Sequence, residues 1–217
     1  MTSPLLKDMK LFRDREAAGE LLAARFENTK ADLVLGIPRG GVVVAAVVAE
    51  KLKLPLDIIV TRKIGAPGQE ELALGAVDSD GEVVWEERLL EELGVRIEDL
   101  KDKVAGELAE IKRREILYQG NRGSLGISGK IVMLVDDGIA TGATVLAAIN
   151  FLKRHQAKRI VVVAPVASKE AVVRIVRQLG EVGEVIVLEI PESFAAVGQF
   201  YHQFEAVSDE EVVQILS

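Results

Sequence analysis

The residues most able to do chemistry lie together in residues 131–144, which read Ile-Val-Met-Leu-Val-Asp-Asp-Gly-Ile-Ala-Thr-Gly-Ala-Thr. An apolar strand is followed by two adjacent acids, Asp136 and Asp137, then by a loop rich in Gly and Thr and by a helix. Glycines at 138 and 142 let several backbone N–H groups converge on one point, where the dipole of the following helix adds positive charge. The pattern predicts a binding site for a phosphate dianion.

The two acids need a second explanation, because a phosphate does not attract carboxylates. Asp136 and Asp137 directly precede the predicted phosphate loop and suit acceptors for two neighbouring hydroxyls of a phosphorylated sugar, such as ribose 5-phosphate. The alternative is that the pair only caps a turn, which we favour less because two adjacent acids are costly without a ligand or cation. The loop is not a triphosphatase P-loop, because no Lys follows Gly142. It also does not match the G-x-G-x-x-G pattern of a dinucleotide loop.

Two further segments carry positive charge after a predicted strand. The run Pro38-Arg39-Gly40-Gly41 follows the apolar residues 33–37, and Arg39 could grip an anion there, or the run could be a plain strand-to-helix turn. Arg62 and Lys63 open residues 62–71, a segment with two glycines and a proline that we expect to be a mobile loop.

These segments must be positioned by a sheet. Short, continuously apolar strands alternating with helices predict an α/β fold with a parallel sheet flanked by helices, and ligands in such sheets bind at the carboxyl ends of strands. We expect strands at 33–37, 56–61, 131–135, 160–164 and 185–188, and helices at 42–53, 144–154 and 168–179. A hairpin at 72–77 and 82–85, a long helix at 99–118, a loop at 120–129 and a last helix that begins with a capping box at Ser208 complete the prediction.

Composition excludes several classes of protein. The 217 residues are 49% hydrophobic and carry a net charge of −7, which argues against a nucleic acid partner. There is no Cys and there are only two His, so we expect no metal site built by the chain itself. No stretch reaches 18 apolar residues, and we expect a cytoplasmic protein with no membrane contact.

At residues 132–144 the sequence resembles the type I phosphoribosyltransferases, whose fold is a Rossmann-like parallel sheet with a small hood. The resemblance implies that Asp136 and Asp137 hold the ribose hydroxyls of phosphoribosyl pyrophosphate (PRPP). It implies that Mg²⁺ is carried mainly by PRPP and pyrophosphate. The residues that it assigns to the 5-phosphate are Gly138, Ile139, Ala140, Thr141, Gly142 and Thr144.

The same resemblance gives roles to the basic segments. Arg39, Gly40 and Gly41 lie where relatives bind pyrophosphate, often beside a non-proline cis peptide. Arg62 and Lys63 are similar to the pair that opens a flexible catalytic loop, where cations stabilise the departing pyrophosphate and closure excludes water. Residues 64–68 lack the further basic residues of the orotate-type loop, so the residue that closes over the site stays open.

The resemblance runs from Phe12 to the C-terminus and is strongest to uncharacterised bacterial and archaeal predicted phosphoribosyltransferases. It implies one domain over 1–217, with a C-terminal flap at 190–217, and a homodimer. A helical insertion at 86–119 is unlike the compact orotate and adenine members of the family. The expected activity is PRPP-dependent transfer to an acceptor such as a nucleobase, and the alternative is a non-catalytic PRPP or nucleotide sensor. The acceptor stays open: aromatic residues at 194–204 could stack on a base or pack as an ordinary flap.

Overall fold

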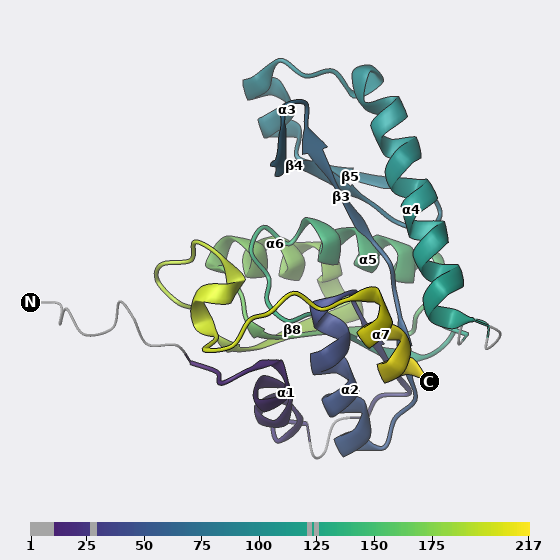
Figure 1. Ribbon diagram of the computed structural model, residues 1–217, viewed down its shortest axis with the longest axis vertical. Coiled ribbons are helices and arrows are strands. Elements are labelled where there is room, and N and C mark those ends of the chain that lie inside the picture. The colour runs from purple at the N-terminus through teal and green to yellow at the C-terminus, as the bar shows by residue number, and fades with distance from the viewer. Residues whose placement is uncertain (1–10, 27–29, 121–122, 124–125) are drawn as a thin grey trace, which may run out of the picture.

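A five-stranded parallel sheet is the centre of the molecule. The computed structural model describes residues 11–26, 30–120, 123 and 126–217, apart from the side chain of Glu71. The strand order is β2-β1-β6-β7-β8, which confirms the predicted α/β fold class (Figure 1). The bounds are β1 Leu33–Gly36, β2 Leu56–Ile58, β6 Ile131–Val135, β7 Arg159–Val166 and β8 Gly183–Glu189.

Helices cover both faces of this sheet because its strands are apolar on both faces. In β1, Leu33 and Leu35 pack toward one side, with residues of α5 and α6, while Val34 packs toward the other, with residues of α1 and α2. Figure 1 shows these two helical layers on opposite sides of the sheet. The helices are α1 Arg15–Ala23, α2 Gly40–Leu52, α5 Ala143–Arg154 and α6 Lys169–Leu179. Of these, α1 is absent from the sequence prediction.

A second, antiparallel sheet of three strands lies above the first, formed by β3 Arg62–Ala66, β4 Gln69–Val77 and β5 Val83–Trp85. The prediction of a mobile loop over 62–71 is therefore wrong, whereas the hairpin around residues 78–81 is confirmed. Pairing with β4 and burial of Ile64 beside Ile111 organise the segment as a strand. The register shifts at Gly65, and this irregularity hides the period of two that would have indicated a strand.

The predicted helical insertion is present as α3 Glu87–Leu93, a short 3-10 helix Ile97–Leu100 and the long α4 Lys101–Gln119 (Figure 1). The chain then returns to β6, and part of the predicted loop 120–129 lies outside the described residues. After β8, the C-terminal segment forms a 3-10 helix, Val197–Phe200, and α7 Asp209–Leu216, whose predicted capping box is confirmed. Within the part of the chain that the structure describes, no helix combines the length and apolar character needed to cross a membrane.

Candidate functional site

The predicted site loops meet because β1 and β6 are neighbours in the sheet. Gly36 pairs with Val135, and the N–H of Ile37 donates to the Val135 carbonyl at 2.9 Å. The segment after β1 and the two acids after β6 therefore leave the sheet side by side at its carboxyl edge, where ligands of parallel sheets bind.

Two glycines allow the loop after β1 to lie directly against the acid pair. A Cβ atom at Gly40 would overlap the carboxylate of Asp137, and one at Gly41 would come within 2.9 Å of the Cα of Asp136. The peptide between Pro38 and Arg39 is cis, as the family resemblance implied. The structure thus brings the predicted pyrophosphate segment and the predicted ribose-binding acids into contact.

The predicted phosphate loop is held from behind by β7 and α6. The N–H of Ile139 donates to the Val166 carbonyl at 2.9 Å, and the hydroxyl of Ser168 donates to the Ala140 carbonyl at 2.6 Å. Arg174 donates to the Thr141 carbonyl at 3.0 Å. The loop carbonyls are thereby turned toward the protein.

The N–H groups of the loop differ from its carbonyl groups, because several of them are not used within the protein. Among the described residues, the backbone N–H groups of Ala140, Thr141 and Gly142 have no intramolecular acceptor. Gly142 has a φ of 81°, in the left-handed region that glycine adopts without strain, and α5 begins at the next residue. Free N–H groups together with a helix N-terminus are features that suit an anion, so the phosphate site stays a prediction that this geometry allows. Thr144 lies in the first turn of α5, half-buried.

The two acids have different surroundings. Burial, followed by the negative charge of Asp137, raises the pKa of Asp136 well above its usual range. The positive charge of Lys63 acts in the opposite direction on this pKa, so that Lys63 lies within electrostatic reach of the pair. One oxygen of Asp136 accepts the N–H of Asp137 at 2.9 Å, which fixes the first carboxyl group.

Asp137 is held by residues from both ends of the described chain. The Nε of Arg15 donates to its Oδ2 at 2.7 Å, and the hydroxyl of Tyr201 donates to its backbone carbonyl at 2.6 Å. Burial and the charge of Asp137 raise the pKa of Tyr201, which therefore keeps its proton for this bond. No sequence signal indicates Arg15, because its partner lies 122 positions away.

Arg39 extends from the first loop toward α7. Its Nη1 donates to Oδ1 of Asp209 at 3.4 Å, a long contact that leaves the guanidinium partly exposed. Asp209 also accepts from Arg113 and from the hydroxyl of Tyr118, both on α4, and these hydrogen bonds lower its pKa. The side chain is thus positioned beside the site and retains capacity for an anion.

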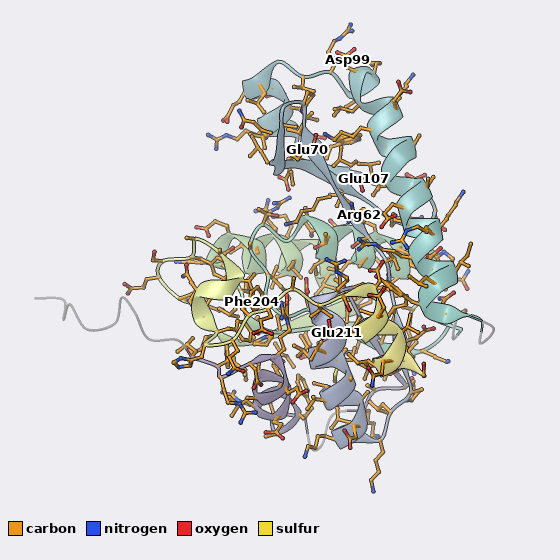
Figure 2. The ribbon with its side chains drawn as sticks, viewed as in Figure 1. Arg62, Glu70, Asp99, Glu107, Phe204 and Glu211 are labelled. Atoms are coloured by element: carbon orange, nitrogen blue, oxygen red, sulfur yellow. The ribbon has the colours of Figure 1, made fainter. Side chains whose placement is uncertain are left out.

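The structure separates the two basic residues of β3. The Nε of Arg62 donates to Glu107 of α4 at 2.7 Å (Figure 2). Successive residues of a strand point to opposite faces, so Lys63 projects from the other side of β3, where it is exposed. Arg62 is therefore engaged with the helical insertion, and Lys63 is the member of the pair that can face the acids.

The C-terminal flap covers one side of the phosphate loop. A Cβ at Gly138 would overlap Val197, so the loop and the flap are in close contact. Phe200 and Tyr201 are buried beside Phe12, which gives them a packing role, whereas Phe204 is partly buried and His202 is exposed. Ser168 and Arg174 escaped the sequence analysis as site residues, although Ser168 is a recognisable N-cap of α6.

Two cavities of the described structure lie away from the predicted phosphate loop. The larger, about 630 Å³, lies between the C-terminal ends of α1 and α2. The second, about 330 Å³, is lined by Arg15, Val43 and flap residues and adjoins the acid pair through Arg15. Among the described residues, no group of three or more His, Cys, Asp and Glu side chains is placed to hold a metal ion.

Comparisons with a family model and with curated proteins point to the same family. Residues 11–204 match the family of phosphoribosyl transferase domains. The chain is 41% identical over 210 residues to a Mycobacterium tuberculosis protein named "Putative phosphoribosyl transferase Rv0571c", covering 96% of this chain and 47% of that protein. It is 30% identical over 152 residues to an adenine phosphoribosyltransferase of Bordetella parapertussis, covering 70% of this chain and 59% of the relative.

Among solved structures, TT1426 from Thermus thermophilus is 42% identical, with a TM-score of 0.77 and coverage of 94% of this chain and 97% of that one. A Neisseria gonorrhoeae protein with bound ppGpp shares the fold at 12% identity, with a TM-score of 0.51 and 96% of each chain covered. The chain spans about half the length of the Mycobacterium relative, 47%.

Proposed function

The chain belongs to the phosphoribosyltransferase family, and on this premise we propose that it transfers the 5-phosphoribosyl group of PRPP to a nucleobase and releases pyrophosphate. The contact between the Gly40-Gly41 segment and the acid pair carries the proposal. It joins the segment that we propose for pyrophosphate to the acids that we propose for ribose, and the loop that we propose for the 5-phosphate directly follows these acids in the chain.

Each part of the edge suits one part of this substrate. Asp136 and Asp137 accept hydrogen bonds from the two ribose hydroxyls. The 5-phosphate accepts from the backbone N–H groups of Ala140, Thr141 and Gly142 and from the hydroxyls of Thr141 and Thr144. Gly138 and Ile139 shape this loop: the first admits the flap, and the second joins it to β7.

The reaction breaks the bond between C1 of ribose and a pyrophosphate oxygen, an acceptor nitrogen forms the new bond to C1, and the proton of that nitrogen passes to the departing pyrophosphate or to water. Negative charge develops on pyrophosphate as it leaves, and cations placed in advance stabilise this charge. Arg39 and Lys63 are the side chains for this task, with the N–H groups of Gly40 and Gly41 beside them. Arg62 contributes by fixing β3 to α4 through Glu107. The Mg²⁺ that PRPP carries supplies further neutralisation of the pyrophosphate.

Positioning accounts for the remaining catalysis. The two acids and the phosphate loop hold the ribose by both ends, so that C1 presents one face to the acceptor. Adenine is the first acceptor to test, because the Bordetella relative is an adenine phosphoribosyltransferase.

The test is release of pyrophosphate from Mg-PRPP across a panel of purines, pyrimidines and small amines. The variant is Asp136→Asn/Asp137→Asn, and a matched control is Asp99→Asn, on the exposed end of the helical insertion. Release with one acceptor, kept in the control and lost in the double variant, supports the proposal and identifies the substrate. Tight PRPP binding without release from any acceptor would favour a sensor, and absence of PRPP binding would overturn the proposal.

A further inference from the structure

We infer that Arg15 is a positioning residue for ribose recognition: it holds Asp137 in the orientation that binds a ribose hydroxyl, and the C-terminal flap in turn holds Arg15. The inference rests on the proposed function, because it concerns how one of the two sugar-binding acids is prepared for its ligand.

The contact between Arg15 and Asp137 is well suited to fix a carboxylate. The Nε–Oδ2 distance is 2.7 Å, and the side chains are only 12% and 14% exposed. Rotation of the carboxyl group is restricted, because Oδ2 is bound by Arg15 and lies against Gly40 so closely that no Cβ would fit between them. Oδ1 is the oxygen that Arg15 does not bind, and we assign it to the ligand.

Arg15 is itself held on two further sides by the flap. Its Nη1 donates to the backbone carbonyl of Glu205 at 2.7 Å, and its guanidinium carbon lies 3.9 Å from the centre of the Phe204 ring. A guanidinium group can stack on an aromatic ring through its face and donate hydrogen bonds in its plane, and Arg15 does both. Phe204 lies in the flap beside the sheet in Figure 2.

The flap is attached to the beginning of α1 by the backbone. The N–H of Phe12 donates to the Phe200 carbonyl at 2.9 Å, and the N–H of Gln203 donates to the Arg13 carbonyl at 2.8 Å. Tyr201, between them, donates to the backbone of Asp137. The flap is thus joined to Asp137 in two ways. The side chain of Arg15 connects it to the carboxylate, and the Tyr201 hydroxyl connects it to the backbone carbonyl.

An ordinary surface ion pair would not have these properties. The pair Arg88–Glu92, for example, joins neighbouring turns of one helix and is 91% and 55% exposed. Such pairs contribute little, because solvent screens the charges and the side chains lose freedom. Arg15 instead contacts a residue 122 positions away, and that residue, Asp137, belongs to the candidate site.

The test uses Arg15→Gln, which removes the charge, and Arg15→Lys, which keeps it but loses the planar fork. Arg13→Gln is the matched control, because Arg13 is exposed and pairs only with the adjacent Asp14 among the described residues. Each full-length protein is titrated calorimetrically with Mg-PRPP, ribose 5-phosphate and pyrophosphate, and thermal unfolding reports whether each variant folds. Asp137→Asn and the double variant Arg15→Gln/Asp137→Asn complete a cycle.

If the inference holds, Arg15→Gln raises the Kd of PRPP and of ribose 5-phosphate by about 10- to 100-fold, the loss expected for a hydrogen bond to a charged group. The Kd of pyrophosphate, which has no ribose, changes by less than about 2-fold. The Kd values of Arg15→Lys lie between those of Arg15→Gln and the wild type, and the Kd values of Arg13→Gln equal those of the wild type. The double variant binds PRPP no more weakly than Asp137→Asn does. A purely structural role would weaken all three ligands together.

Two results overturn the inference in distinguishable ways. If the wild type binds PRPP and both Arg15 variants bind it equally well, or if pyrophosphate binding falls in parallel, Arg15 does not prepare the ribose site, and the proposed function stands. If the wild type binds neither PRPP nor ribose 5-phosphate, the proposed function fails and the role of Arg15 fails with it. Should Arg15→Gln not fold, the Arg15→Lys titration alone decides by the same criteria.

Discussion

Two adjacent aspartates at the candidate site are given unequal environments by their neighbours. Burial and the charge of Asp137 raise the pKa of Asp136, whereas Asp137 has the guanidinium of Arg15 in contact with it. Two like charges side by side disfavour one another, and a cation on one member of the pair leaves the other to take up a proton. Above its raised pKa, Asp136 carries a charge in an unfavourable environment, and a sugar hydroxyl that donates to this carboxylate reduces the cost.

Asp136→Asn is predicted to stabilise the unliganded protein at neutral pH. The folded pKa of Asp136 lies above the ordinary value of 3.8, so its contribution to stability is greatest below 3.8 and is lost as the pH rises through the folded pKa. Asn keeps the acceptor for the Asp137 N–H without the charge. We expect a gain on the order of 1 kcal/mol at pH 7 and none at pH 3, read from denaturant unfolding at both values, together with loss of PRPP binding. An equal effect at both pH values would contradict the argument.

Gly40→Ala is predicted to damage the site more than the fold. The added Cβ would overlap the Asp137 carboxylate, so the loop or the acid must move. We expect pyrophosphate release to fall by about 100-fold or more, on the order of 3 kcal/mol in transition-state stabilisation, with a melting temperature near that of the wild type. Gly106→Ala, on α4 where a Cβ meets nothing within 4 Å, is the control. Unchanged release in Gly40→Ala would mean that the two segments do not act together.

At the scale of elements, the three-stranded sheet lies between α5 and the helical insertion. Ala76 of β4 packs on Ala143 and Ala147, in the first turns of α5, so the second sheet rests on the helix whose N-terminus faces the phosphate loop. On its other side, Ile64 and Arg62 contact α4. The position of Lys63 over the site therefore depends on the seating of β3 on α4.

Glu107→Gln is predicted to loosen β3 and slow the reaction without affecting the phosphate loop. The Arg62–Glu107 ion pair is partly buried, and its loss costs on the order of 1 kcal/mol. We expect faster amide hydrogen exchange in residues 62–66, a several-fold lower kcat and an unchanged affinity for inorganic phosphate. Glu92→Gln, which removes an exposed pair on α3, should alter none of these. If amide hydrogen exchange becomes faster only in other segments, Glu107 does not hold β3 in place.

At the scale of the whole molecule, α4 and α7 are joined by charges. Asp209 accepts from Arg39, Arg113 and Tyr118, and Glu110 accepts from Arg113 and Arg114. These hydrogen bonds lower the pKa of both acids, that of Glu110 to about 2. The junction links the long helix of the insertion to the last helix, and it includes Arg39 of the segment that we propose for pyrophosphate.

Acid is predicted to open this junction. An acid whose folded pKa is depressed contributes stability that is present above its ordinary pKa, 4.5 for Glu110, and is lost as the pH falls toward about 2. Wild type should therefore lose stability between these values more steeply than Glu110→Gln, whose stability is already reduced at pH 7. Thermal melts followed by circular dichroism from pH 7 to pH 2 measure both curves. Parallel curves would show that the junction does not contribute.

The parallel sheet, its helices α2, α5 and α6, and the loop that leads into α5 follow from local patterns and so could be predicted, whereas α1 could not. Continuous apolar runs indicated strands, and residues 136–144 carried their own turn and helix signals. Residues 62–71 were misread because Gly65 and Ala66 are small and the strand is irregular, so its order comes from pairing with β4 and contact with α4. The role of Arg15 in the site could not be foreseen either, since an isolated arginine on a surface helix has no pattern that indicates its distant partner.

The attachment of the flap to Asp137 has a consequence for the order of synthesis. A chain that has emerged as far as Glu189 contains every strand of the five-stranded sheet and can begin to fold, because domains fold as they are made. It still lacks Tyr201, Phe204 and Glu205, and therefore two of the three groups that hold Arg15 as well as the hydroxyl bound to the Asp137 backbone. The nascent protein acquires its sheet before the candidate site is complete, and a ribosome-bound chain stalled before the flap is expected to be folded but unable to bind PRPP.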